Sequence, residues 1–172
     1  MIFVTVGTQL PFDRLVRAVD EWCAGGPGRE GEVFAQVGMV GSQNFRPRQF
    51  DYAERITPQE FSRKVRSADV IVSHAGMGSI ITALTFRKPI VIMPRRADLG
   101  EHRNDHQLAT ARHLADRPGV HVAATEAELG PLLDSLVTRR GSAEMDRLPQ
   151  YAADGLIGAL RDFIRDEETK AD

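Results

Sequence analysis

The residues best suited to chemistry stand together in SHAGMGS, residues 73–79, directly after the apolar run ADVIV. A glycine-bearing turn that leads into a helix presents unpaired backbone N–H groups and the positive end of the helix dipole. Gly76 and Gly78 lack side chains that would keep a phosphate away. Ser79 adds a hydroxyl donor, and His74 can donate another hydrogen bond. The stretch favours a phosphate-binding site, and a tight strand-to-helix turn with a structural histidine fits it equally well.

Other chemistries have little support in the sequence. The glycine spacing matches neither the Walker A motif nor the dinucleotide G-x-G-x-x-G pattern, and no G-x-S-x-G stretch indicates a serine hydrolase. Cys23 falls in a predicted helix rather than a reactive loop. His102 and His106 stand four residues apart without the following glutamate of a zinc motif, and no D-x-D stretch suggests a manganese-bound nucleotide sugar. We therefore expect no metal site.

Two further loops carry polar residues after predicted strands. Gly7 and Thr8 form a second glycine turn, for which a simple tight connection is the plainer interpretation. The stretch NDHQ opens a predicted helix, where its side chains can reach a polyhydroxylated ligand or merely cap the helix. Its members are Asn104, Asp105, His106 and Gln107.

The loop 94–103 is rich in arginine. We expect this loop to border the predicted anion site with its three arginines, Arg95, Arg96 and Arg103. Loop arginines are usually solvated, but here they could complement a diphosphate or a carboxylated substrate.

Short apolar runs alternate with helical patterns along the whole chain, and helix starts carry capping residues such as Thr57 with Glu60 and Thr125 with Glu128. This alternation predicts an α/β, Rossmann-like, doubly wound and mostly parallel sheet with helices on both faces. In such folds the loops at the carboxyl ends of the strands converge on the ligand. The expected strands are 2–6, 32–37, 53–56, 69–73, 89–94 and 120–124, and the expected helices are 11–23, 57–68, 78–86, 104–116, 126–137 and 156–164.

The composition of the chain limits the possible class of protein, its partners and its location. The 172 residues suit one domain with a substantial core, and 42% hydrophobic and 27% charged residues are ordinary for a globular protein. A net charge of -2 gives no indication of nucleic acid as a partner. A single cysteine excludes an internal disulfide framework and favours a reducing compartment. The sequence shows neither a membrane-spanning apolar run nor a signal peptide, so a cytoplasmic location is expected.

The ordered set MIFVTVGTQLPFDRL, ADVIVSHAGMGSI, KPIVIMPR and NDHQLATA resembles the C-terminal, donor-binding domain of GT-B glycosyltransferases of family 28. The resemblance covers most of residues 1–124. The pattern is most similar to the soluble subunit of two-component enzymes, both the PssE type of exopolysaccharide or capsule synthesis and the soluble catalytic subunit of the dolichol-linked N-acetylglucosamine transferase. It implies half of a GT-B fold, with a donor-binding domain over 1–155 and a C-terminal helix and tail over 156–172 that packs on the domain or docks to a partner.

The resemblance also implies a UDP-sugar as substrate and no cofactor. The implied contacts are Ile56 and Thr57 at the uracil, His74, Gly78 and Ser79 at the diphosphate, and Asn104, His106 and Gln107 at the sugar. Thr82 stands where many relatives have a glutamate that binds the ribose hydroxyls. Since threonine offers a single hydroxyl, the resemblance leaves the recognition of the ribose open.

The implied reaction is inverting, metal-independent sugar transfer to a polyprenyl-diphosphate-linked saccharide. The acceptor half, its membrane anchor and the general base would belong to a PssD-type partner that recruits this chain to the inner face of the membrane. His74 and the helix terminus would stabilise the departing UDP. Arg95, Arg96 and Arg103 favour UDP-glucuronate, because arginine grips a carboxylate bidentately, while UDP-glucose, UDP-galactose and UDP-GlcNAc stay open.

Two other functions compete with this one. The first is a non-catalytic nucleotide- or phosphate-binding regulatory module with a flavodoxin-like fold, which would bind its ligand tightly without transferring a sugar. The second is a sugar-nucleotide epimerase or hydrolase that acts alone, which is expected to need a full second domain or an internal acid–base set, and neither is visible in the sequence.

Overall fold

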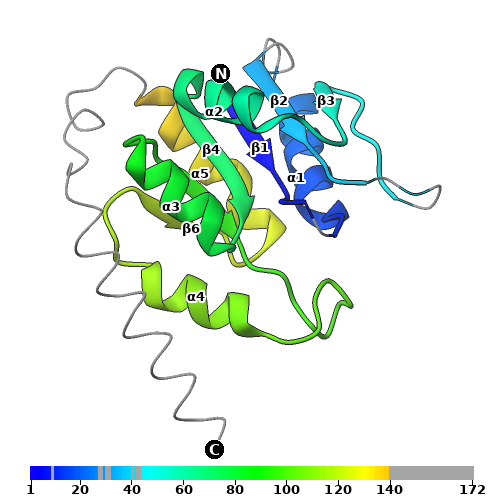
Figure 1. Ribbon diagram of the computed structural model, residues 1–172, viewed down its shortest axis with the longest axis vertical. Coiled ribbons are helices and arrows are strands. Elements are labelled where there is room, and N and C mark those ends of the chain that lie inside the picture. Colours follow the sequence, from blue (N-terminus) through cyan, green and yellow to red (C-terminus); the bar gives the residue numbers. More distant parts are fainter. Residues whose placement is uncertain (9, 27–28, 30–31, 40, 42–43, 140–172) are drawn as a thin grey trace, which may run out of the picture.

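A computed structural model of the chain describes residues 1–8, 10–26, 29, 32–39, 41 and 44–139 (Figure 1). The expected terminal helix 156–164 and the tail 156–172 lie outside the described residues. Within the described part, no helix is long and apolar enough to cross a membrane.

The core of the fold is one six-stranded sheet in which every neighbouring pair of strands is parallel. The strands are β1 (Ile2–Thr5), β2 (Val33–Gln36), β3 (Asp51–Ala53), β4 (Val70–His74), β5 (Ile90–Met93) and β6 (Val120–Val122). Their spatial order is β3-β2-β1-β4-β5-β6, so the chain reverses its direction of winding between β1 and β4. This confirms the predicted doubly wound sheet and places the ligand crevice beyond the carboxyl ends of β1 and β4.

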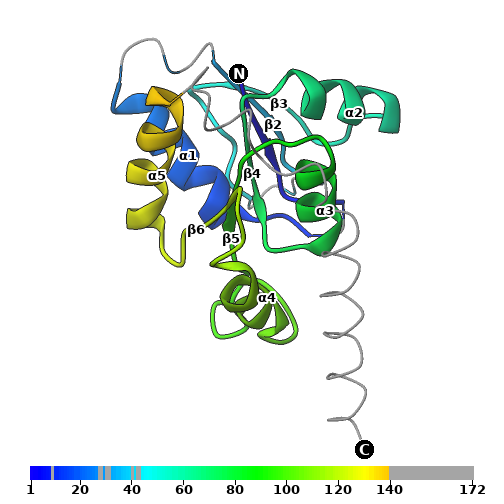
Figure 2. The same ribbon diagram turned by 90° about the vertical axis from the view of Figure 1, so that its left-hand side faces the viewer.

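Helices cover both faces of the sheet (Figure 2). One face carries α1 (Asp13–Ala24) and α5 (Glu126–Thr138), and the other carries α2 (Pro58–Ser67), α3 (Met77–Thr85) and α4 (His106–Leu114). Side chains of β1 alternate between the layers: Ile2 and Val4 pack with α1 and α5, whereas Phe3 packs with α2 and α3. Because both faces are covered, strands such as IFVT and IVIM are buried throughout rather than on alternate residues.

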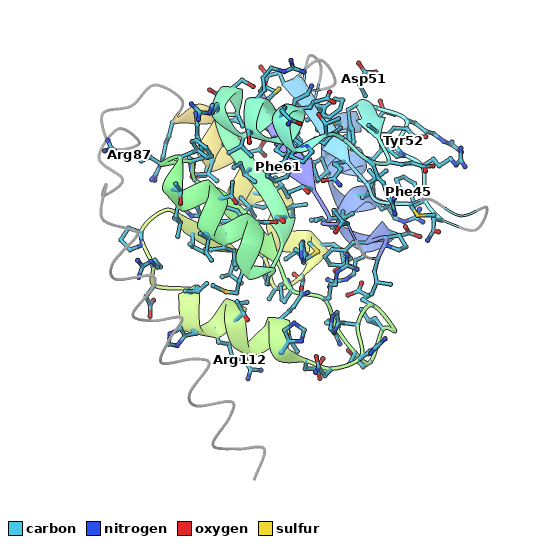
Figure 3. The ribbon with its side chains drawn as sticks, in the orientation of Figure 1. Phe45, Asp51, Tyr52, Phe61, Arg87 and Arg112 are labelled. Carbon is cyan, nitrogen blue, oxygen red and sulfur yellow. The ribbon has the colours of Figure 1, made fainter. Side chains whose placement is uncertain are left out.

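The helix layer formed by α2, α3 and α4 makes an aromatic contact with the sheet. Phe61 of α2, labelled in Figure 3, meets Phe3 edge-on with 5.4 Å between ring centroids. The start of α2 is fixed by Thr57, whose hydroxyl accepts a hydrogen bond from the backbone N–H of Glu60 at 3.2 Å. This confirms the predicted capping residue and anchors α2 beside the crevice.

Several predicted helix boundaries were wrong. α1 begins at Asp13, so Pro11 precedes the helix instead of lying in its first turn. α4 begins at His106, because Asp105 turns its carboxylate back to accept from the backbone N–H of Ala97 at 2.9 Å. Thr125 also differs from a simple cap, since its hydroxyl donates to the Glu128 carboxylate at 3.0 Å.

The weak strand expected over 53–56 was placed too late in the sequence. β3 covers Asp51–Ala53, in register with Phe34, Ala35 and Gln36 of β2. As an edge strand with exposed or half-buried side chains, β3 lacks the apolar run that identifies the central strands. α3 begins at Met77, one residue before the predicted start at Gly78.

Candidate functional site

A cleft of about 670 Å³ opens beyond the carboxyl ends of β1 and β4. It is bounded by the loop after β1, the start of α2, the β4–α3 turn and the start of α4, which confirms that the three predicted loops converge. Most of the predicted site residues line it: Gly7, Thr8, Ile56, His74, Gly76, Gly78, Ser79, Thr82, Arg95, His106 and Gln107.

Three predicted residues lie outside that lining. Thr57 serves as the cap of α2, and its neighbours Ile56 and Pro58 reach the cleft instead. Arg103 and Asn104 are exposed on the loop before α4. Asn104 acts on the site through its neighbour, since its Oδ1 contacts Nδ1 of His106.

The two glycines of the β4–α3 turn have different physical roles. At Gly76, the N-cap of α3, a Cβ would lie 2.1 Å from Nε2 of His74, so the imidazole excludes any side chain. At Gly78 a Cβ would meet no other described part of the chain within 4 Å. Packing therefore explains Gly76 but not Gly78. The space at Gly78 lies in the first turn of α3, where backbone N–H groups face a ligand.

His74 is enclosed by glycines on two sides. Gly7 has φ +80°, in the left-handed region, and a Cβ there would lie 3.0 Å from Cε1 of His74. The imidazole thus fills the gap between the turn after β1 and the turn after β4. One side chain fixes the distance between the two glycine turns.

Buried polar contacts behind Gly7 hold its turn in place. The Thr5 hydroxyl donates to Oε1 of Gln36 at 2.9 Å, and Nε2 of Gln36 donates to the Gly7 carbonyl at 3.4 Å. Both side chains are buried, and both reach the floor of the cleft. Sequence reasoning missed them, although a glutamine that ends a buried strand is itself a signal, because buried polar groups need partners.

The hydrogen bonds of His74 determine which ring nitrogen carries the proton. The Ser73 hydroxyl donates its hydrogen to the Thr5 carbonyl at 2.8 Å. In the 3.2 Å contact between Ser73 Oγ and His74 Nδ1, the ring must therefore be the donor. This assigns the proton of the neutral imidazole to Nδ1 and leaves Nε2 as an acceptor.

The charge state of His74 follows from its surroundings. Burial, together with the positive charge of Arg95, lowers the pKa of His74 from 6.5 to about 4, and His102 and His106 add smaller contributions in the same direction. The ring is therefore neutral at pH 7. The sequence predicted that His74 donates to an anion. From Nε2, such a bond requires the ring to take up a proton.

The start of α4 adds polar groups at the other end of the cleft. Gln107 is buried, and its Oε1 accepts from the backbone N–H of Arg95 at 3.1 Å. The rings of His102 and His106 meet edge-on, with 4.5 Å between their centroids. Nδ1 of His102 is buried without a hydrogen-bond partner in the described structure. Sequence reasoning considered His102 only as a weak metal ligand, and no cluster of three metal-binding side chains occurs among the described residues.

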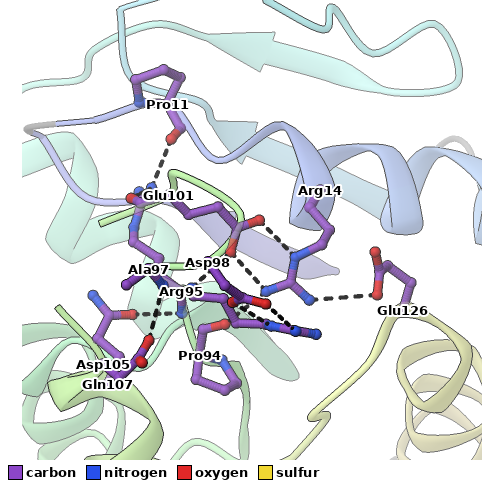
Figure 4. A network of polar contacts seen from close by, with 11 residues as sticks. Pro11, Arg14, Pro94, Arg95, Ala97, Asp98, Glu101, Asp105, Gln107 and Glu126 are labelled. Carbon is purple, nitrogen blue, oxygen red and sulfur yellow. Dashed lines mark hydrogen bonds and ion pairs between the residues drawn. The ribbon is translucent and has the colours of Figure 1, made fainter. Parts of the chain in front are cut away.

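The three arginines of the loop after β5 do not act together. Arg95 is buried and donates to backbone carbonyls, whereas Arg96 is exposed and pairs with Asp98 (Figure 4). Arg103 projects from the exposed part of the loop. The guanidinium groups of Arg95 and Arg96 thus have partners within the chain, and their binding of a substrate carboxylate stays a prediction.

A mostly buried ion pair fixes the same loop against α1 (Figure 4). Nε and Nη2 of Arg14 reach the two carboxylate oxygens of Glu101 at 2.6 and 2.9 Å, and Nη2 also donates to the Pro94 carbonyl at 2.8 Å. The Glu101 carboxylate accepts in addition from the backbone N–H of Arg96 at 2.9 Å. This bidentate pair holds the loop that carries Arg95 and leads into α4.

The Thr82 hydroxyl donates its hydrogen bond within α3. Its hydroxyl donates to the Gly78 carbonyl at 2.7 Å, so the oxygen faces the cleft only as an acceptor. A ribose hydroxyl could donate to it, whereas a bidentate contact of the kind a carboxylate makes is not available from this side chain.

Comparison with known proteins gives a family match and a set of similar folds. The family model described as glycosyltransferase family 28 C-terminal domain matches residues 1–149. MurG of Acinetobacter baumannii superimposes with a TM-score of 0.62 at 19% identity, over 86% of this chain and 44% of MurG. CalG4, the calicheamicin glycosyltransferase, gives 0.61 at 18% identity, over 87% and 37% of the two chains. No curated protein matches in sequence.

The structure of ALG13 differs from these in length. It superimposes with a TM-score of 0.55 at 21% identity, over 81% of this chain and 86% of its own. The chain thus spans less than half of MurG and CalG4 but most of ALG13. At these identities the similarity shows the fold.

Proposed function

Because the chain belongs to the glycosyltransferase family 28 C-terminal domains, we propose that it is the donor-binding subunit of an inverting glycosyltransferase that uses a UDP-sugar. The observation that carries the proposal is the empty space at Gly78, at the N-terminus of α3 and inside the cleft. A diphosphate there would accept hydrogen bonds from the first turn of α3 and lie at the positive end of its dipole. The uracil would lie toward Ile56, and the sugar toward His106 and Gln107.

In the proposed reaction a hydroxyl of the acceptor attacks the anomeric carbon while the bond to the β-phosphate oxygen breaks. Negative charge then develops on the departing UDP, where the N–H groups of α3 and the hydroxyl of Ser79 would stabilise it. The hydroxyl proton must pass to a general base, which we assign to the partner subunit. The contribution of this chain is therefore to bind and orient the donor and to stabilise the leaving group.

The partner would be a membrane-anchored subunit that binds a polyprenyl-diphosphate-linked saccharide in exopolysaccharide synthesis. The support for a two-component enzyme is the resemblance of the motifs to those of two-component glycosyltransferases. The acceptor side of the active site would then be completed only in the complex.

The first test is calorimetric titration of the purified chain with UDP, UDP-glucuronate, UDP-glucose and NAD. We expect binding of UDP and at least one UDP-sugar, and no binding of NAD, because the glycine spacing lacks the dinucleotide pattern. If the isolated chain binds nothing, the titration is repeated on a complex with the proposed membrane-anchored partner. Failure of UDP to bind there as well would contradict the proposed function.

The donor sugar is tested at Arg103. With Arg95 and Arg96 already engaged, Arg103 is the arginine of this loop best placed to meet a glucuronate carboxylate, since it follows His102 of the cleft. Arg103→Ala should weaken UDP-glucuronate binding about tenfold, the loss of one charge-assisted hydrogen bond, and leave UDP-glucose unchanged. Arg96→Ala is the matched control and should affect neither donor. Equal losses for both donors would exclude recognition of a carboxylate by Arg103.

A further inference from the structure

Arg95 is a buried cation that forms no ion pair with a carboxylate among the described residues. It belongs to the lining of the cleft, yet the residue is only 3% exposed. Within the described residues no carboxylate forms an ion pair with it, because both oxygens of the nearby Glu101 are bound to Arg14. Burial lowers the pKa of Arg95 to about 10, so the guanidinium stays charged at pH 7. The Glu101 carboxylate offsets part of this charge through space, but a buried charge without a direct ion pair is still costly and calls for a functional reason.

The guanidinium is surrounded by carbonyls of the loop after β1. Nη2 donates to Val6 and Leu10 at 3.0 and 2.8 Å, and Nη1 donates to Pro11 at 2.7 Å. The face of the group lies 4.5 Å from the ring centroid of Phe12. These contacts bracket the turn that brings Gly7 and Thr8 to the cleft. The carbonyl dipoles solvate the cation in part and leave its net charge in place.

Arg95 also joins the remaining walls of the cleft. It follows β5 directly, and its backbone N–H donates to Gln107 of α4 at 3.1 Å. Its charge reaches His74 at the end of β4, as the pKa of that ring shows. One residue therefore connects the β1 turn, the end of β5 and the start of α4, all of which contribute to the lining of the cleft.

We infer that Arg95 is a positioning residue with an added electrostatic role: it holds the β1 turn at the cleft and supplies the positive charge that a bound diphosphate neutralises. The inference rests on the proposed function, because the ligand is the same UDP-sugar. It differs from the expectation of a carboxylate-gripping arginine, since the nitrogens Nη1 and Nη2 already serve the backbone. The ligand would feel the charge of Arg95 without taking over its hydrogen bonds.

Two substitutions separate the charge of Arg95 from its hydrogen bonds. Arg95→Gln keeps an amide donor but removes the charge, and Arg95→Lys keeps the charge but loses most of the fork of donors. The ligands are UDP and uridine, which differ by the diphosphate. Arg95→Gln should weaken the binding of UDP by tenfold or more and that of uridine far less, because a positive charge in the lining of the cleft is removed. Arg95→Lys should weaken the binding of UDP and of uridine by a similar factor, smaller than the loss of UDP binding in Arg95→Gln.

A second readout is independent of ligand affinity. The NMR titration of His74 should show its pKa rising toward 6.5 in Arg95→Gln and staying near 4 in Arg95→Lys, since Arg95 is the second largest cause of the lowered value. A role that is only structural would move the two variants alike. Arg96→Gln, on the exposed neighbour, is the control and should change neither affinity nor titration.

The outcomes separate the inference from the proposed function. If the unaltered protein binds UDP and Arg95→Gln binds it equally well, the inference is overturned and the function stands. If the unaltered protein and its complex do not bind UDP, the proposed function itself fails. Should Arg95→Gln not fold, the ratio of UDP to uridine affinity in Arg95→Lys decides: a ratio equal to that of the unaltered protein supports the inference, and a lower ratio overturns it.

Discussion

Replacing Gly78 by alanine should weaken UDP binding at least tenfold while making the fold more stable. The added Cβ meets no other described part of the chain within 4 Å, so the folded chain has room for it. Alanine is favoured over glycine in a helix interior by up to about 1 kcal/mol, and Gly78 belongs to α3. A phosphate drawn to the first turn of α3 would meet the methyl group and lose hydrogen bonds worth about 1.5–3 kcal/mol each. Calorimetry and urea unfolding measure the two effects.

The prediction combines a loss of UDP affinity with a gain in stability, and few other effects of a substitution would produce both. A general loss of structure would lower affinity and stability together, whereas a blocked phosphate site lowers affinity alone. Gly78→Val should extend the loss of binding, since a branched side chain fills more of the same space. Tight UDP binding by Gly78→Ala would place the diphosphate elsewhere in the cleft.

Gly76→Ala is the matched control within the same turn. Its Cβ would lie 2.1 Å from Nε2 of His74, so the imidazole must leave its position between Gly7 and Gly76. We expect this variant to lose stability, by the 1–3 kcal/mol typical of an overpacked site, because the ring is enclosed on both sides. The two glycines thus differ in what they protect, one a histidine and the other a ligand.

The central part of the fold could be predicted from sequence because burial on both faces leaves a clear pattern. β1, β4 and β5 contain the apolar runs IFV, VIV and IVIM, and each is followed by a helix with an apolar face. β3 could not be placed correctly, because it pairs along one edge only and its residues are exposed or half buried. Register at such an edge depends on the neighbouring strand more than on the residues themselves.

The candidate site, too, could be predicted from the sequence only in part. The glycines and polar residues of the β4–α3 turn are neighbours in sequence, so their joint chemistry is visible in the sequence. Arg95 was assigned to a polar loop, yet its partners Val6 and Leu10 stand 89 and 85 positions away. The pair of Arg14 and Glu101 spans 87 positions. Such contacts depend on the sheet order, which a single sequence does not specify.

His74 should make the stability of the fold depend on pH between about 6.5 and 4. The unfolded chain binds a proton at this ring near pH 6.5, whereas the folded chain does so only near pH 4. Between these values the unfolded state holds more protons, so lowering the pH favours unfolding. The contribution of the neutral ring is complete above pH 6.5 and lost by pH 4, and a shift of this size corresponds to about 3 kcal/mol. Urea unfolding at pH 7, 5.5 and 4 measures it.

His74→Asn is the comparison that isolates this ring. Asparagine can still donate a hydrogen bond to Ser73 but does not titrate, so its unfolding free energy should fall less between pH 7 and pH 4. His121, whose pKa burial also lowers, contributes equally to both proteins and cancels in the difference. Parallel pH curves for the two proteins would show that His74 is not held neutral by its surroundings. Diverging curves would show that the surroundings of His74 keep its ring neutral in the folded protein.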